Sequence, residues 1–176
     1  CYLRVQTQSH FGNRLYFYAA VDTGWMMLFE YENADDPTAL RDSLVDLNGD
    51  GHLDYWIYNY GSSGCCLRHV YQVYLYHPDK QQLGYAARLM NPTFYPQEQL
   101  VRGFGYGHGD DMALYTFRWK DGQLDSLEYI EPPFENALDT PHIVRSYWVE
   151  GERLVTLLDS VPAVYRTIED AYWIGY

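Results

Sequence analysis

The sequence predicts an all-β fold of antiparallel meanders with one or two short helices. Short runs of aromatic and β-branched residues recur along the chain, separated by Gly, Pro, Asp and Asn, which is the pattern of strands and turns. Signals that start or stop helices are few. The clearest predicted strands are residues 15–21, 55–60, 70–76 and 114–119.

Three segments have the pattern of β-hairpins. An acidic residue followed by glycine separates strand-like runs within residues 119–124, and the same pattern recurs 29 residues later within 148–154. His77-Pro78-Asp79-Lys80 separates two further runs, 70–76 and 83–89. Successive hairpins predict a meander, and meanders can form blades, a sandwich or a barrel.

Two short helices are predicted outside these strands. Asp36-Pro37 precedes the first, over residues 38–42. Ser160 precedes the second, which would place Val164, Ile168 and Ala171 on one face. The glycine-rich residues 103–111 predict a surface loop. We expect one core tryptophan per strand unit from the spread of Trp25, Trp56, Trp119, Trp148 and Trp173.

Composition limits the classes of function. The chain has 176 residues, with 24 acidic and 12 basic side chains and a net charge of −12, and only two of the basic residues are lysines. This charge argues against nucleic-acid binding and favours a cationic partner. Hydrophobic residues make up 47% of the chain and aromatic residues 18%, which excludes disorder. The length predicts a single domain over residues 1–176.

Cysteine usage leaves the cellular compartment weakly determined. The sequence starts at Cys1, as mature bacterial lipoproteins do, and a trimmed chain is the alternative interpretation. Cys65 and Cys66 are adjacent, and a disulfide between neighbouring residues is strained. The sequence contains no run of 18 apolar residues, so no transmembrane segment is predicted.

The pattern D-x-N-x-D-G-x-x-D is the one motif with a specific chemistry. It places oxygen-bearing side chains at alternate positions, and Gly51 permits the sharp turn that wraps such a loop around an ion. His52 would contribute its backbone carbonyl. Hard oxygen donors favour Ca²⁺ over Zn²⁺, and an Asx-rich turn without metal is the alternative. The predicted ligands are Asp46, Asn48, Asp50, His52 and Asp54.

The loop does not fit an EF-hand. Position 12 of an EF-hand is a bidentate glutamate and helices flank it, whereas Ile57 stands at position 12 here and residues 55–60 are strand-like. We therefore predict a calcium loop that joins two β-strands. Its three carboxylates repel one another until an ion neutralises them, so the ion would add stability to the fold.

A family resemblance rests on the order of several motifs. After the calcium loop come a Gly/Ser loop and then Tyr71-x-Val73-Tyr74-Leu75-Tyr76, Asn91-Pro92-Thr93-Phe94 and Tyr115-x-Phe117-Arg118-Trp119-x-Asp121-Gly122-x-Leu124. This order, over roughly residues 42–135, resembles the FG-GAP-related, propeller-like secreted bacterial proteins. Members of that family include periplasmic immunity lipoproteins that inhibit lysozyme-type effectors of secretion systems.

The resemblance implies a propeller-like fold, Ca²⁺ in the loop, export to the periplasm or outer membrane, and inhibition of a cell-wall-degrading toxin. The chain is short for a complete propeller of four-stranded blades, so a partial or divergent propeller and a sandwich-like variant both stay open. The expected partner is a basic peptidoglycan hydrolase. A carbohydrate- or adhesion-binding module of the cell envelope is the alternative.

An inhibitor needs a rigid projecting surface, and tyrosine is a frequent contact residue because it buries area with few torsions to fix. Two segments fit: residues 58–63 follow the calcium loop by one strand, and residues 104–108 are aromatic and glycine-rich. The predicted contact residues are Tyr58, Tyr60, Ser62, Phe104, Tyr106 and His108. For any individual tyrosine, packing on a strand face is the alternative.

Catalysis is not expected. Residues 61–65 lack the final glycine of a nucleophile elbow, and the spacing of Cys66 and His69 does not establish a dyad. His108-Gly109-Asp110-Asp111 is better interpreted as a solvated polar loop than as half of a metal site. No set of nucleophile, base and oxyanion donors can be assembled, which predicts a binding protein.

Overall fold

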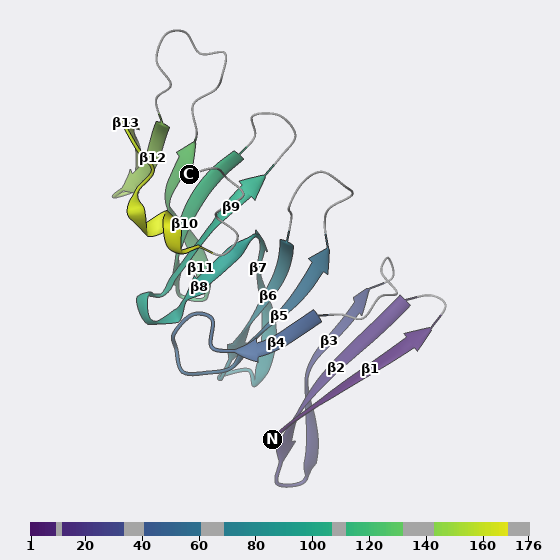
Figure 1. Ribbon diagram of the computed structural model, residues 1–176. Helices are drawn as coiled ribbons and strands as arrows, with labels where there is room; N and C mark the ends of the chain where they lie inside the picture. The colour runs from purple at the N-terminus through teal and green to yellow at the C-terminus, as the bar shows by residue number, and fades with distance from the viewer. Residues whose placement is uncertain (10–11, 34–40, 61–68, 107–111, 132–142, 169–176) are drawn as a thin grey trace.

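The computed structural model describes residues 1–9, 12–33, 41–60, 69–106, 112–131 and 143–168. These residues form three antiparallel sheets and two short 3₁₀ helices, which confirms the all-β prediction. The sheets follow one another in chain order, and each is a meander of sequential strands (Figure 1). No helix in the described part of the chain is long and apolar enough to cross a membrane.

The first sheet contains β1 (Tyr2–Ser9), β2 (Gly12–Val21) and β3 (Gly24–Asn33). The second contains β4 (Arg41–Val45), β5 (Asp54–Tyr60), β6 (His69–His77) and β7 (Gln82–Met90). The third contains β8 (Pro92–Tyr95), β9 (Leu100–Tyr106), β10 (Met112–Lys120), β11 (Gln123–Glu131), β12 (Ile143–Val149) and β13 (Glu152–Leu158). The helices are η1 (Pro96–Glu98) and η2 (Ala163–Thr167).

The predicted hairpins are present, and their turns show why glycine follows the acidic residue. Between β10 and β11, Asp121 and Gly122 have φ values of 51° and 73°. Between β12 and β13, Glu150 and Gly151 have φ values of 51° and 86°. Two successive residues with positive φ match the right-handed twist of the flanking strands, so these turns fix the register of both hairpins.

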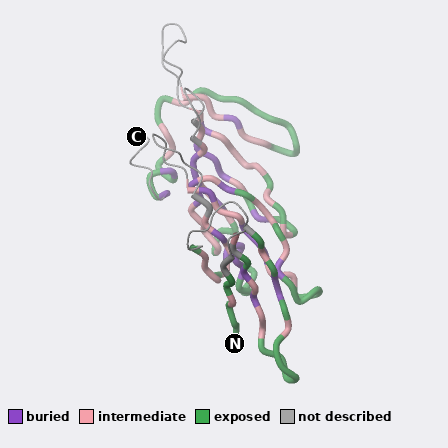
Figure 2. The backbone as a smooth tube through the Cα atoms, turned by 90° about the vertical axis from the view of Figure 1, so that its right-hand side faces the viewer, coloured by how far each residue is buried: buried purple, intermediate pink, exposed green. Residues whose placement is uncertain are grey.

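The hydrophobic core lies between the layers as three clusters (Figure 2). Aromatic residues dominate the first cluster, between the first and second sheets, where the Phe29 and Tyr74 rings meet edge to face at 4.5 Å. The second cluster joins the second and third sheets around Trp119. The third lies between the third sheet and η2, where Tyr165 and Ile168 are buried.

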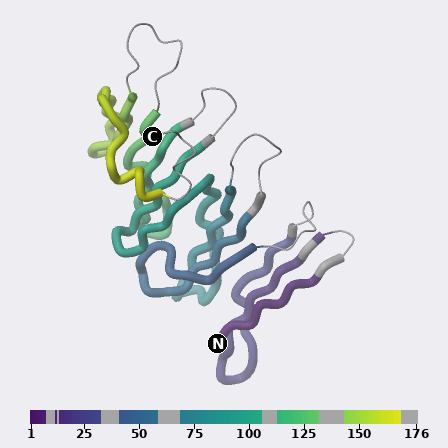
Figure 3. The backbone as a smooth tube through the Cα atoms, viewed as in Figure 1, coloured from purple at the N-terminus to yellow at the C-terminus, as the bar shows by residue number. Residues whose placement is uncertain are grey.

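Strand β1 and the segment that contains η2 lie at opposite ends of this row of sheets (Figure 3). The three sheets therefore pack against one another in chain order, the first on the second and the second on the third. Each meander buries one face against the next, because an isolated sheet of this size could not bury enough apolar surface.

One predicted short helix is wrong and the other is present. Arg41 and Asp42 begin β4 rather than ending a helix, and residues 38–40 lie outside the described residues. After Ser160 the chain forms the short 3₁₀ helix η2, and Ile168 directly after it is extended. Ile168 is buried as predicted, but Val164 is exposed and Tyr165 is buried in its place, while Ala171 is not described.

The tryptophan and loop predictions also change. Among the described tryptophans only Trp119 is a core residue, and Trp25 is half exposed on β3. Residues 103–106 belong to β9, so that part of the predicted glycine-rich loop is a strand, whereas residues 107–111 lie outside the described part. Gly103 on β9 allows the Tyr115 side chain to pack closely against the strand, because a Cβ at this position would clash with the Tyr115 hydroxyl.

Candidate functional site

The predicted calcium loop joins β4 to β5, so it is a connector between adjacent antiparallel strands, as the sequence predicted. Asp46, at its first position, accepts two backbone hydrogen bonds from inside the loop. Its Oδ1 accepts from Gly49 N at 2.6 Å and its Oδ2 from Gly51 N at 3.0 Å. Both glycines have positive φ, 79° and 84°, which lets the backbone wrap around the carboxylate.

Asn48 and Asp50 continue this wrapped arrangement. Asp50 N donates to Asn48 Oδ1 at 3.0 Å, and the Asn48 amide donates back to Asp50 Oδ2 at 2.9 Å. His52 N donates to Asp50 Oδ1 at 2.8 Å. The His52 ring lies 5.5 Å from the Tyr76 ring.

Asp54 closes the loop and is fully buried. Its Oδ2 accepts from Leu47 N at 2.9 Å and its Oδ1 from Tyr76 N at 3.0 Å, so one carboxylate connects the loop to β6. Burial raises the pKa of Asp54 from its ordinary 3.8 to about 6, the charges of Asp50 and Asp46 act in the same direction, and the two N–H groups oppose them. A cation in the loop would favour the ionised carboxylate.

The loop also contacts the third sheet. A Cβ placed on Gly49 would lie 2.0 Å from the carbonyl oxygen of Pro96, at the start of η1 between β8 and β9. Asn48 beside it is buried. The loop, which is the β4–β5 connection of the second sheet, therefore packs against the β8–β9 connection of the third, and an ion in the loop would brace both.

The donor set fits a hard cation. The side chains at positions 1, 3, 5 and 9 supply only carboxylate or amide oxygens, and three of them carry a negative charge. In the described residues, however, no three His, Cys, Asp or Glu side chains converge into a preformed metal cage. Binding Ca²⁺ through these side chains would require the Asn48 amide to release Asp50 Oδ2, so that this oxygen can turn to the ion.

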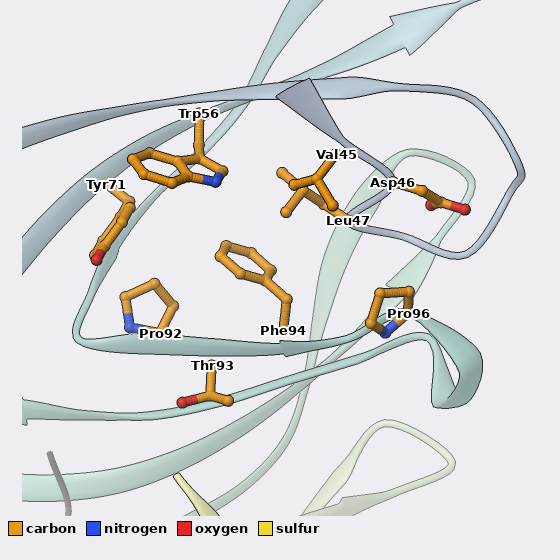
Figure 4. A pocket seen from close by; sticks show the side chains of 9 residues that line it. All are labelled: Val45, Asp46, Leu47, Trp56, Tyr71, Pro92, Thr93, Phe94 and Pro96. Atoms are coloured by element: carbon orange, nitrogen blue, oxygen red, sulfur yellow. The ribbon is translucent and has the colours of Figure 1, made fainter. Parts of the chain in front are cut away.

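A pocket of about 250 Å³ lies beside the loop, between the second sheet and β8 (Figure 4). The Trp56 and Tyr71 rings meet edge to face at 5.1 Å, Phe94 faces them, and the Asp46 carboxylate points away. The lining residues are Val45, Asp46, Leu47, Trp56, Tyr71, Pro92, Thr93, Phe94 and Pro96. Sequence reasoning missed this pocket because its aromatic residues come from three strands whose packing no local pattern reveals.

Of the six predicted contact residues, the structure describes the surroundings of two, Tyr58 and Phe104. Tyr58 is half-buried, its hydroxyl lies 2.7 Å from His69 Nδ1, and the Arg41 guanidinium lies 5.8 Å from its ring. Phe104 is wrong as a surface anchor, because only 2% of it is exposed and it belongs to the third core cluster.

The other contact predictions remain predictions. Tyr60 is the last residue of β5 and Tyr106 the last of β9. Ser62 and His108 lie outside the described residues. The ends of β5 and β9 point to the same side of the molecule in Figure 1, although the two strands belong to different sheets.

Comparisons with known proteins extend the description of the fold. No family model matches the chain, and no curated protein matches it. A solved structure of a Xanthomonas protein related to the type IV secretion system is similar, with a TM-score of 0.51, 14% sequence identity, and coverage of 89% of this chain and 86% of that one. At this identity the similarity shows a shared fold over most of both chains.

Proposed function

We propose that the protein is an exported calcium-binding immunity protein that binds and blocks a bacterial cell-wall-degrading toxin, lysozyme-like or amidase. The observation that carries this proposal is the wrapped Asp46–Asp54 loop, set between two sheets of a fold shared with a secretion-system-related protein. The motif order that resembles periplasmic immunity lipoproteins supports it.

Inhibition in this proposal is occlusion of the toxin's cleft. The braced loop stiffens β5, and Tyr58, Tyr60 and Tyr106 lie on the two strands whose ends face one side. A rigid surface loses little entropy on binding. The net charge of −12 would attract a basic hydrolase and make the association rate fall with ionic strength.

Mixing the protein with a panel of muramidases and amidases in Ca²⁺ is expected to abolish turnover of its cognate enzyme at micromolar concentration. Tyr60→Ala and Tyr106→Ala should each raise the concentration needed for half inhibition by about tenfold, because interface tyrosines often contribute 1–2 kcal/mol or more. Tyr85→Ala, an exposed tyrosine on β7, is the matched control. Absence of a micromolar complex with every enzyme tested would contradict the proposal.

Calcium is expected to raise the melting temperature of the protein, and a chelator to lower it. At a concentration about 100 times the dissociation constant, a single site adds about 2.7 kcal/mol of stability. The affinity should be modest, on the order of 10⁻⁴ to 10⁻³ M, as in extracellular calcium modules. Thermal denaturation across a Ca²⁺ titration, with Mg²⁺ in parallel, measures the effect.

Asp50→Ala should remove the calcium-dependent part of this stability, since Asp50 is an exposed loop ligand whose loss leaves the core intact. Asp125→Ala, an exposed aspartate on β11, removes the same charge away from the loop and should leave the calcium response unchanged. Equal calcium responses of Asp50→Ala and the unmodified protein would exclude this loop as the binding site.

A second candidate function is carbohydrate binding, which the pocket beside the loop favours. Trp56, Tyr71 and Phe94 give it aromatic walls of the kind on which sugar rings pack. This alternative predicts retention on a purified peptidoglycan or other envelope glycan without any protein partner. A glycan pulldown with Trp56→Ala as the comparison separates it from the inhibitor proposal.

A further inference from the structure

The third sheet carries a second pocket whose chemistry differs from that of the calcium loop. It has a volume of about 500 Å³, within the range of about 300–1,000 Å³ of small-molecule sites. Its floor is a face of β9 to β12, and Pro162 and Val164 from the segment around η2 form one wall. The side chains that carry the argument below are Leu100, Arg102, Thr116, Glu128, Arg145 and Tyr147.

Strand register explains why these residues share one face. Arg102 on β9 is paired with Thr116 on β10, Thr116 with Glu128 on β11, and Glu128 with Tyr147 on β12. Directly paired residues project to the same side of an antiparallel sheet. Arg145 is two residues before Tyr147 and therefore projects to the same face. The sheet thus lines up a polar row across four strands.

Arg145 is held in place by two groups. Its Nε donates to Glu128 Oε2 at 2.6 Å, and its guanidinium lies 4.9 Å from the centre of the Tyr147 ring. Tyr165 donates to the other Glu128 oxygen at 2.8 Å and lies 2.7 Å from the Thr116 hydroxyl, which fixes the carboxylate. In the described residues the two terminal amino groups of Arg145 have no protein acceptor, and 40% of its side chain is exposed.

Arg102 is held in the same manner on the other side. Its Nη2 donates to Glu98 Oε2 at 2.8 Å, and its guanidinium lies 4.5 Å from the centre of the Tyr95 ring. Only 12% of its side chain is exposed. Two arginines, each positioned by one carboxylate and one aromatic ring, therefore line one pocket.

The pocket is close to electrically neutral, although the chain carries −12. Its two arginines are each paired with one glutamate, Arg145 with Glu128 and Arg102 with Glu98. A planar guanidinium donates two parallel hydrogen bonds to a carboxylate or phosphate group. Leu100 and Val164 add apolar contact surface beside these donors.

We propose that this pocket binds a small oxyanion, a carboxylate or phosphate group carried on an apolar body. The Nη edge of Arg145 receives the oxyanion, Arg102 lines the same pocket while paired with Glu98, and the apolar body packs against Leu100 and Val164. The proposal is independent of the calcium loop and of toxin inhibition, because none of its residues belongs to that loop or to the predicted contact segments.

The test compares benzoate with its neutral isostere benzamide by NMR titration at constant ionic strength, and phenyl phosphate is the second anion. Benzoate or phenyl phosphate should saturate, with a dissociation constant on the order of 1 mM, and benzamide should bind at least about tenfold more weakly. The stronger of the two anions identifies the carboxylate or the phosphate as the natural group. Two results would overturn the proposal. One is equal binding of benzoate and benzamide. The other is that neither anion saturates the protein at about 10 mM, ten times the expected dissociation constant.

Arg145→Gln should weaken anion binding by about tenfold or more, because charge-assisted hydrogen bonds contribute 1.5–3 kcal/mol. Arg14→Gln is the matched control, since Arg14 is also paired with a glutamate, Glu32, but lies exposed on the first sheet. Arg145→Lys keeps the charge, provides a variant that folds if the glutamine is not tolerated, and should still lose several-fold affinity. Unchanged affinity in folded variants of Arg145 would refute the assignment.

Discussion

Gly49→Ala is expected to lower the free energy of unfolding by about 3 kcal/mol or more, the largest effect of any single methyl group near the calcium loop. The added Cβ would lie 2.0 Å from the Pro96 carbonyl oxygen and 2.9 Å from its carbon, and these are backbone atoms that cannot rotate away. The φ of 79° adds the strain of a left-handed conformation. Either the loop or the connection between β8 and β9 must move.

Gly51→Ala is the control for this prediction. Gly51 has a φ of 84°, but a Cβ there would meet nothing within 4 Å, so only the backbone strain of about 1–2 kcal/mol applies. For a chain of this length, the Gly49 variant should melt about 10 °C lower than the unmodified protein. Equal stability of the two variants in thermal or urea unfolding would show that the loop does not press on the third sheet.

Asp54→Ala is expected to destabilise the protein even without calcium. The change leaves two buried N–H donors, those of Leu47 and Tyr76, without an acceptor, at about 1–3 kcal/mol each. Removing a carboxylate whose burial raises its pKa to about 6 offsets part of that loss. We therefore expect a net loss of about 2 kcal/mol in chelator.

Calcium should widen this difference, because the variant also loses a ligand of the ion. In saturating Ca²⁺ the gap between Asp54→Ala and the unmodified protein should grow to about 5 kcal/mol, through the additional 2.7 kcal/mol of ion binding. Asp50→Ala should cost less than Asp54→Ala in chelator, because the two hydrogen bonds that it removes, from His52 N and the Asn48 amide, lie within the loop, and its gap from the unmodified protein should grow in calcium. Urea unfolding of both variants and of the unmodified protein, each with and without Ca²⁺, gives the six values that the comparison needs. A calcium-independent gap for Asp54→Ala would assign this residue a structural role alone.

The sequence predicted the local elements well because their signals are local. Hairpin turns such as Asp121-Gly122 need positive φ at two successive positions, and only a few residue pairs accept that conformation. The position of the Asp46–Asp54 loop between two strands also followed from the alternating pattern after it. The helix predicted over residues 38–42 was wrong because its evidence was a single Asp-Pro start signal, and pairing of β4 with β5 took its last two residues into a strand.

Burial was the property that sequence reasoning misjudged. Phe104 was expected to project from a glycine-rich loop, whereas β9 turns it into the core beside Ile130. Trp25 was expected in the core, yet it stays half exposed on β3. Which face of a strand is covered depends on the neighbouring layer, and that layer comes from residues far away along the chain.

By itself the sequence determined the antiparallel meanders, their turns and the oxygen-rich connector, because each depends on backbone preferences and side-chain chemistry within a few residues. Tertiary structure alone decided that Gly49 presses on Pro96, that Asp54 is buried against β6, and that Arg102 and Arg145 line one pocket. These contacts join different strands and, for Gly49, different sheets. Their distances are set by register and layer packing, which no local pattern in the chain encodes.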